Sequence, residues 1–149
     1  READIAIRLS RPTVAELVIR KLATVTFFLY ASPTYLAKNN VHDRAFIAYD
    51  ASMDDTPQQT WLQTQAGSHP IVLRSNDLAI QAAAAIAGVG IAVLPEFMGS
   101  QNEYLVRVPH KGVPPKREIW IVVHSDLRHA PRIQAVMAFV SECFKQKAN

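Results

Sequence analysis

The chain has 149 residues, of which 49% are hydrophobic, so it can bury a core and is expected to form one domain or two small lobes. No apolar run reaches the roughly 18 residues of a membrane span and no secretory leader opens the chain, while the single cysteine, Cys143, excludes an internal disulfide and fits a reducing compartment such as the cytoplasm. The net charge is +3 and the sixteen Lys and Arg residues are scattered, which argues against a nucleic-acid-binding surface on this chain.

A predicted β-strand opens the chain over residues 3–9. Ile5, Ile7 and Leu9 alternate with other residues at a period of two, so one face of the strand is apolar and needs buried neighbours. The chain has supplied no such neighbours before this strand. We therefore expect the first structural unit to be incomplete, and its open apolar edges to favour self-association.

An extended region and a short helix follow. Two extended segments, 17–22 and 25–31, are rich in β-branched and aromatic residues. Ser32 and Pro33 then suit the N-cap and the first position of a helix over 33–38. Plain capping explains this serine better than anion binding at the helix start.

A short strand over 45–49 precedes a polar segment, 50–59. We expect this segment to be a surface loop, because it contains Pro57 and lacks periodicity. Its three aspartates do not have the spacing of a calcium-binding loop, and the glycine that such a loop requires is missing. No metal site is therefore expected.

The alanine-rich middle of the chain predicts a strand–helix–strand unit around which the rest is organised. Buried strands are predicted at 71–73 and 91–94, with a helix over 76–87 that is buried on most sides. Parallel strands joined in this way gather ligands at their carboxyl ends, beside the helix N-terminus. The polar run at 74–77 lies there and is the best site candidate, although capping alone explains polar residues at a helix start.

The last part of the chain predicts two strands and a helix. A strand over 104–108 is followed by a connection, 109–117, suited to a crossing between lobes. The strand over 119–123 is nearly continuous in apolar residues, so it should be central in a sheet. Pro131 opens the last helix. Its apolar stripe should face the core or an interface and consists of Ile133, Val136, Met137, Val140, Cys143 and Phe144.

The motifs of common enzymes and cofactor sites do not appear. No serine lies in a Gly-x-Ser-x-Gly turn, and no sequence argument brings a histidine to Ser75 and Asp77 to form a triad. The five histidines show no i,i+4 pair that would suit a metal. Gly88-Val89-Gly90 follows a helix, which is the wrong side for a dinucleotide-binding turn. We expect neither enzymatic activity nor a cofactor.

Several segments, taken in order, resemble the effector-binding domain of LysR-type transcriptional regulators. They are ADIAIRL at 3–9, YASPTYLA at 30–37, SNDLAIQAAAAIAGVGIAVLPEF at 75–97, and IWIVVHSD with PRIQAVMAFVSECF near the end. The resemblance covers nearly the whole chain. It implies an α/β, two-lobed fold like that of the type II periplasmic binding proteins, with a small-molecule cleft between the lobes.

The resemblance also implies how the chain divides. Residues 1–22 would belong to a first lobe that is only partly present, 23–116 would form a complete second lobe, and 117–149 would return the chain to the first lobe. The helix-turn-helix domain that precedes this domain in the family is absent here, so DNA contact is expected only through that domain. A homodimer or higher oligomer, a cytoplasmic location and no membrane partner are implied as well.

Two functions remain after this comparison. The resemblance implies a domain that senses a small-molecule effector and transmits the signal through movement of the lobes to the dimer interface. The alternative is the solute-binding protein of a transporter, which shares the two-lobed architecture. Such a protein would carry an export signal or a lipidated cysteine, and the ordered segments fit regulators better.

The expected effector site combines the helix start with residues taken from the family comparison. At the helix start, a hydroxyl, an amide and unpaired backbone N–H groups can bind a ligand. In the comparison Arg8 would add a positive charge from the first lobe, although an ordinary ion-pair arginine is an equal reading. A small carboxylate is the favoured effector, opposed by the charge of Asp77. The expected site residues are Arg8, Thr56, Pro57, Gln58, Ser75, Asn76 and Asp77.

Overall fold

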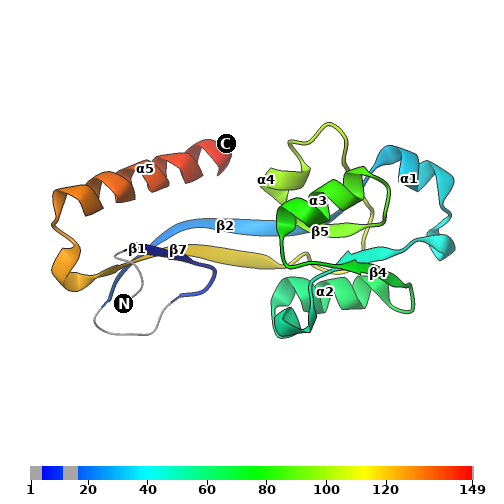
Figure 1. Cartoon of the computed structure of the whole chain (residues 1–149), viewed down its shortest axis with the longest axis horizontal. Helices are drawn as coiled ribbons and strands as arrows, with labels where there is room; N and C mark the ends of the chain where they lie inside the picture. Colours follow the sequence, from blue (N-terminus) through cyan, green and yellow to red (C-terminus); the bar gives the residue numbers. More distant parts are fainter. Residues whose placement is uncertain (1–4, 12–16, 149) are drawn as a thin grey trace. The chain divides into compact units, whose positions relative to one another are not determined.

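The computed structural model describes residues 5–11 and 17–148, and the chain forms two compact units (Figure 1). The first unit consists of residues up to 25 together with 117–149, and the second consists of residues 26–116. Ala3 and Asp4, where the first strand was expected to begin, lie outside the described residues. No helix within the described ranges is long and apolar enough to cross a membrane.

The first unit is built on a strand that lies between two others. β7 (Lys116–His124) is flanked by β1 (Ile5–Arg8) and β2 (Leu17–Ala31), and β1 and β7 are antiparallel. Ile121 and Val123 of β7 are almost completely buried, which confirms its predicted central place. Lys21 and Glu118 form an ion pair of 2.9 Å, and this partner lowers the pKa of the Glu118 carboxyl.

Two elements of the first unit differ from expectation. β2 is one strand of 15 residues, although two segments were predicted, because pairing with neighbouring strands outweighs the weak strand propensity of Ala23. α5 (Pro131–Ala148) begins at the predicted proline, but of its predicted apolar stripe only Ile133 is fully buried. Val136 is 43% exposed, and Phe139, outside the stripe, is 70% exposed. The stripe thus faces the core at the start of the helix, its residues Met137, Val140, Cys143 and Phe144 are half-buried, and the alternative, an interface, stays a prediction.

The second unit contains the predicted strand–helix–strand arrangement with a third strand inserted. β3 (Phe46–Ala48) pairs in parallel with β4 (Ile71–Arg74) and also forms a parallel bridge to Ile91, directly before β5 (Ala92–Pro95). β3 therefore lies between the two strands that α3 (Leu78–Ile86) connects. β5 and the short β6 (Val106–Arg107) pair antiparallel with β2.

The capping signals read from the sequence are confirmed at two helix ends. α1 (Pro33–Lys38) has its predicted bounds, and Ser32 Oγ accepts the Tyr35 N–H at 3.0 Å. Gly88 ends α3 with a φ of 82°, the left-handed conformation that glycine adopts without strain.

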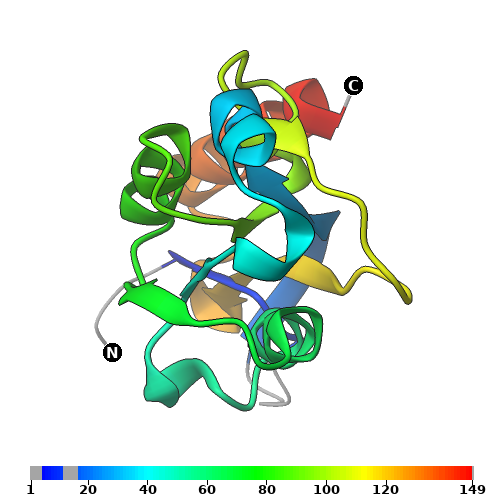
Figure 2. The same ribbon diagram turned by 90° about the vertical axis from the view of Figure 1, so that its right-hand side faces the viewer.

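The helix α2 (Pro57–Ala66) corrects the loop that was predicted over 50–59. Only residues 50–56 are irregular, and they include a 3-10 turn at Ala51–Met53. The sequence did not predict this helix because its buried face carries Gln58 and Gln59 beside Leu62 and Ala66, so that the apolar residues show no helical period. α2 and α3 both contact β3 and lie on opposite sides of the β3–β4 pair (Figure 1, Figure 2).

Burial of β4 and α3 is lower than predicted. Val72 is 51% exposed because β4 lies at the edge of its two-stranded sheet. Ile80 is also 51% exposed, and in α3 only Gln81 and Ala85 are fully buried. One side of the helix therefore faces solvent, and its single polar residue is among the most buried.

The core of the second unit places a large aromatic ring against a helix end. The core residues are Tyr30, Ile47, Ala85, Ala92, Leu94 and Leu105. Gly99 ends the short helix α4 (Glu96–Gly99), and a Cβ atom at this position would overlap the ring of Tyr30. The hydroxyl of Tyr30 is also hydrogen-bonded to Ser100 Oγ at 2.8 Å. Glycine at position 99 is thus required by close packing.

We expect Gly99→Ala to lower the free energy of unfolding by about 1–3 kcal/mol, because the added methyl group would force Tyr30 out of its packed position. Ser100→Ala is the matched control. It removes only the hydroxyl partner of Tyr30 and should cost about 1 kcal/mol. Urea denaturation measures both, and a Gly99→Ala protein no less stable than Ser100→Ala would contradict this packing argument.

We expect Gln59→Leu to cost about 1–3 kcal/mol, because Gln59 is fully buried and its side chain bonds both backbone groups of Tyr49. Gln63→Leu, one turn later and exposed, should change stability by less than about 0.5 kcal/mol. Chemical denaturation of the two variants side by side tests this. Equal losses would mean that the buried amide has no special role.

Candidate functional site

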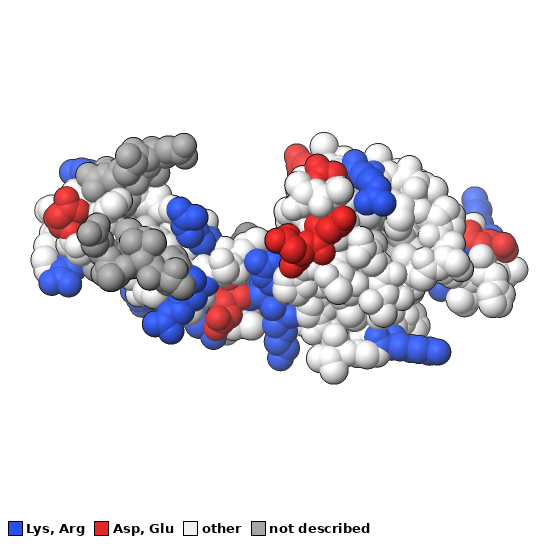
Figure 3. All heavy atoms as spheres, turned by 90° about the horizontal axis from the view of Figure 1, so that it is seen from below, with Lys and Arg blue, Asp and Glu red and all other residues white. Residues whose placement is uncertain are grey.

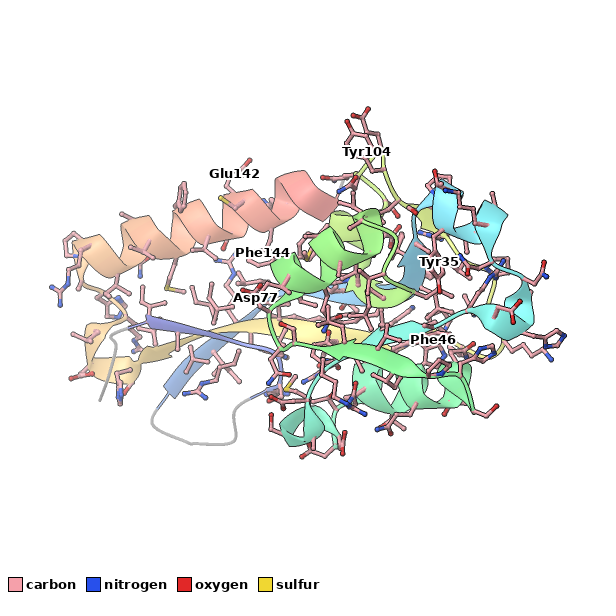
Figure 4. The ribbon with its side chains drawn as sticks, turned by 45° about the vertical axis from the view of Figure 1, so that its right-hand side comes forward. Tyr35, Phe46, Asp77, Tyr104, Glu142 and Phe144 are labelled. Atoms are coloured by element: carbon pink, nitrogen blue, oxygen red, sulfur yellow. The ribbon has the colours of Figure 1, made fainter. Side chains whose placement is uncertain are left out.

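The polar turn between β4 and α3 is closed by its own side chains. Asp77 is the N-cap of α3, and its Oδ1 accepts the N–H groups of Ala79 at 2.8 Å and Ile80 at 3.4 Å (Figure 4). Ser75 Oγ accepts the N–H of Asp77 at 3.1 Å. The helix was expected to begin at 76 with open donors. It begins at Leu78 instead, and Asp77 already occupies two of the donors.

Some hydrogen-bonding capacity in this turn is left for a ligand. Ser75 is half-buried, and because its oxygen acts as acceptor toward Asp77, its hydroxyl hydrogen can be donated elsewhere. The N–H of Leu78 is the first-turn donor that Asp77 does not take, since the N–H of Gln81 bonds the carbonyl of Asp77. A ligand with hydrogen-bond acceptors would therefore find two donors, the Ser75 hydroxyl and the Leu78 N–H, next to the carboxylate of Asp77.

Asn76 joins this turn to the segment that follows β3. Its Nδ2 donates to Asp50 Oδ2 at 2.8 Å and to Ser52 Oγ at 3.3 Å, while its Oδ1 accepts the N–H of Asp50 at 3.0 Å. The hydroxyl of Ser52 also donates to Asp50. We call these three residues, Asp50, Ser52 and Asn76, the polar clasp. The amide of Asn76 was expected to face a ligand, and it is instead engaged in holding two segments together.

The clasp stabilises a negative charge. Hydrogen bonds from the side chains of Ser52 and Asn76 lower the pKa of the Asp50 carboxyl, and the positive charge of Arg74 adds to the effect. Asp54 and Asp55 are exposed in the same segment. Seen from below, acidic atoms gather on the second unit near the start of α2 (Figure 3). The electrostatic character of this side of the unit is therefore acidic.

The predicted wall Thr56-Pro57-Gln58 is the beginning of α2. Thr56 is the N-cap and also donates its hydroxyl to the carbonyl of Met53 at 2.7 Å. Pro57 holds the first helical position, and Gln58 is buried with 2% exposure. The segment 50–56 connects these residues to the turn at 75–77, because its first residue, Asp50, bonds Asn76 and its last residue, Thr56, is the N-cap of α2. Two groups of predicted site residues, 56–58 and 75–77, are thus both linked to the polar segment 50–56.

Arg8, the remaining predicted site residue, belongs to the first unit. It lies at the end of β1 opposite Trp120 of β7, and it is exposed. Its contribution to a site on the second unit stays a prediction.

The buried amide of Gln81 supports the turn from inside, and the sequence argument did not single it out. Its Nε2 donates to the carbonyl of Ser75 at 2.7 Å. Its Oε1 is buried without a hydrogen-bond partner among the described residues. Its position as the single polar residue of an alanine-rich helix was the signal in the sequence that could have indicated this role. The turn is therefore fixed to the helix by a group that solvent does not reach.

A second residue that sequence reasoning missed is Gln59 of α2. Its Oε1 accepts the N–H of Tyr49 at 3.3 Å, and its Nε2 donates to the carbonyl of Tyr49 at 3.1 Å. Arg74 Nη1 donates to the same carbonyl at 2.9 Å. The end of β3 is thus bonded to both α2 and β4. Among the described residues, no three His, Cys, Asp or Glu side chains gather in a way that could hold a metal ion.

One curated protein and several solved structures that are similar to this chain are transcriptional regulators or their regulatory domains. The chain is 28% identical over 144 residues to the Mau operon transcriptional activator of Paracoccus denitrificans, which covers 97% of the chain and half the length of that activator. The regulatory domain of CrgA, a LysR-type regulator from Neisseria meningitidis, matches 96% of the chain and 76% of its own length with a TM-score of 0.73 and 19% identity.

A further structure is similar over nearly the whole chain. The regulatory domain of CcmR from Synechocystis PCC6803, solved in complex with 2-PG, covers 97% of the chain and 74% of its own length, with a TM-score of 0.66 and 17% identity. At such low identities the two solved structures inform on the fold alone. This fold is that of LysR regulatory domains, and it confirms the predicted α/β fold of the type II periplasmic-binding class.

The family model of the LysR substrate-binding domain matches residues 1–145, nearly the entire chain. Nothing in these comparisons favours the solute-binding protein of a transporter. The fold of both units and the family model agree, and the chain belongs to the LysR substrate-binding domain family.

Proposed function

We propose that this chain is the effector-sensing domain of a LysR-type transcriptional regulator and that it binds a small molecule without transforming it. The family match over residues 1–145 carries this proposal. It is supported by the regulatory domain of CcmR, which was solved with 2-PG bound. A binding role also suits the turn at 75–77, whose polar groups can orient a ligand.

The parent regulator would bind DNA through a helix-turn-helix domain outside this chain, which spans half the length of the Paracoccus activator. We propose that it acts in the cytoplasm as a homodimer or higher oligomer. Residues up to 25 with 117–149 would correspond to the first lobe and 26–116 to the second, as the two compact units suggest.

The proposed effector site lies at the start of α3. Ser75 would donate its hydroxyl, the N–H of Leu78 would donate from the backbone, and Thr56 to Gln58 at the start of α2 would limit the site on one side. A carboxylate remains our proposed effector class only if Arg8 supplies its positive charge, because Asp77 and Asp50 oppose an anion. A thermal-shift screen of small carboxylates, amino acids and aromatics tests the function, since a ligand of the folded state raises apparent stability.

We expect Arg8→Ala to weaken binding of a carboxylate found in this screen by one to two decades, which corresponds to roughly 1.5–3 kcal/mol for a charge-assisted bond. Ser75→Ala should cost less, because the backbone donor remains. Arg20→Ala and Ser68→Ala, two exposed positions, are the matched controls. Calorimetric titration compares all four variants. Unchanged affinity in both Arg8→Ala and Ser75→Ala would place the effector elsewhere.

We expect Asp50 to titrate below the ordinary aspartate value of about 3.9, because its clasp partners stabilise the charged form. A carboxyl with a lowered folded-state pKa contributes stability above its unfolded value, and that contribution is lost as the pH falls through the folded value. Asn76→Ala should raise the pKa of Asp50 and reduce the stability that is lost as the pH falls.

Carboxyl-carbon NMR titration measures the pKa of Asp50 in each variant. Asn40→Ala, at an exposed asparagine that is no part of the clasp, should leave the titration of Asp50 unchanged. An Asp50 that titrates identically in the wild-type and Asn76→Ala proteins would show that the clasp does not hold in solution.

A further inference from the structure

A groove lies at the end of α3 opposite to the proposed effector site. Its volume is about 510 Å³, and it is lined by α1, by the last turn of α3 with Gly88, and by the loop residues Glu103 and Tyr104. α3 has nine residues, so its length of about 13 Å separates this groove from Asp77. The groove is therefore a separate depression within the second unit, and its volume is in the range of small-molecule sites.

The loop that carries the aromatic wall of the groove is anchored through its backbone, while the ring of Tyr104 is exposed. Tyr104 is 60% exposed, and its N–H is accepted by Asn102 Oδ1 at 2.9 Å in a closed turn. The next residue, Leu105, is buried in the core and anchors the loop. In Figure 4 the loop carrying Tyr104 and the helix carrying Tyr35 are both visible. An aromatic side chain has only two rotatable angles, so the exposed ring offers apolar contact at little cost in conformational entropy.

Two opposite charges border the same groove. Lys38 ends α1 and Glu103 lies in the loop, and both are exposed. Neither forms an ion pair within the described part of the chain, although Arg107–Glu96 and Lys21–Glu118 do. The two charges are therefore available to a ligand that carries a negative group for one wall and a positive group for the other.

The end of α3 adds a further preference for a positive group. N–H groups of Ala87, Gly88 and Val89 occupy the carbonyls of Ala83, Ala85 and Ala84. These capping bonds leave the carbonyls of Ile86 and Ala87 unused, at the negative end of the helix dipole. Ile86 also gives the groove an apolar surface. The walls of the groove thus combine the cation Lys38, the carboxylate of Glu103 and the carbonyls at the end of α3, and the apolar surface of Ile86 and Tyr104.

We propose that this groove binds a free amino acid with an apolar or aromatic side chain. The carboxylate of the ligand pairs with Lys38, its ammonium group with Glu103 and the carbonyls at the end of α3, and its side chain lies against Tyr104 and Ile86. A simple anion would meet Glu103, and a simple cation would meet Lys38, so only a zwitterion uses both walls. This site is independent of the effector site proposed above.

The test is an amide NMR titration of the full 149-residue chain with L-phenylalanine. We expect saturable shifts at Lys38, Gly88 and Tyr104, with a dissociation constant in the millimolar range. N-acetyl-phenylalanine lacks the ammonium group and phenylalanine amide lacks the carboxylate. Each should bind about two- to fivefold more weakly, as expected for one exposed ion pair.

The variants link each ligand group to one residue. In Glu103→Gln the disadvantage of the N-acetyl derivative should shrink, because only the carbonyls at the end of α3 remain for the ammonium group. In Lys38→Met the disadvantage of the amide should disappear. Tyr104→Ala should remove the preference for phenylalanine over glycine. Lys111→Met and Asp43→Asn, at exposed charges outside the groove, should behave as the wild type.

Three results would overturn the proposal. The first is the absence of saturable shifts at the groove. The second is shifts confined to residues 75–77, which would move the amino acid to the proposed effector site. The third is an equal weakening of all ligands by Glu103→Gln and Lys38→Met, which would show that these two charges do not pair selectively with the ammonium and carboxylate groups of the ligand.

Discussion

The arrangement of the second unit depends on the hydrogen bonds made at Tyr49, the residue directly after β3. The buried amide of Gln59 satisfies both backbone groups of Tyr49, and Arg74 from β4 reaches the same carbonyl. A buried peptide group without partners would cost about 1–3 kcal/mol, so these bonds decide where α2 can lie against the strands. Asp50, the next residue in the chain, then meets Asn76. The clasp is placed by the buried bonds one residue earlier.

This arrangement separates positioning from binding. Gln59 and Gln81 are fully buried and fix α2 and the 75–77 turn, whereas Ser75, Asp77 and Asp50 remain at least partly accessible. Buried amides can hold a site in place without contacting a ligand, because the hydrogen bonds that they make are shielded from competing water. Accessible side chains at the same site can then vary with little effect on the fold.

The fold was largely predictable from the sequence because its strongest signals are local. Ser32-Pro33 gave the bounds of α1, and Gly88 gave the end of α3, since each has a specific steric or capping role. α2 was missed although Thr56-Pro57 carries the same cap signature as Ser32-Pro33. Two glutamines on its buried face hid the apolar period, and the partner of Gln59, the backbone of Tyr49, cannot be read from a sequence. The same limit concealed the clasp, because Asp50 and Asn76 are 26 positions apart.

The polar run at 74–77 ends β4 and forms the turn before α3, as the sequence predicted, while its place in an effector site stays a prediction. The capping role of Asp77 could not be read from the sequence, for a physical reason. An aspartate at a helix start can cap the helix or stand beside an open anion site, and the sequence pattern is identical in the two cases. Here Asp77 caps, so the positive end of the helix is largely neutralised from within. At the other end, the last turn of α3 carries no basic side chain of its own, and the nearby groove is lined by one cation and one anion, Lys38 and Glu103. The end of α3 that no side chain of its own neutralises is therefore the C-terminal one, where its alanines are followed by Ile86 and the groove.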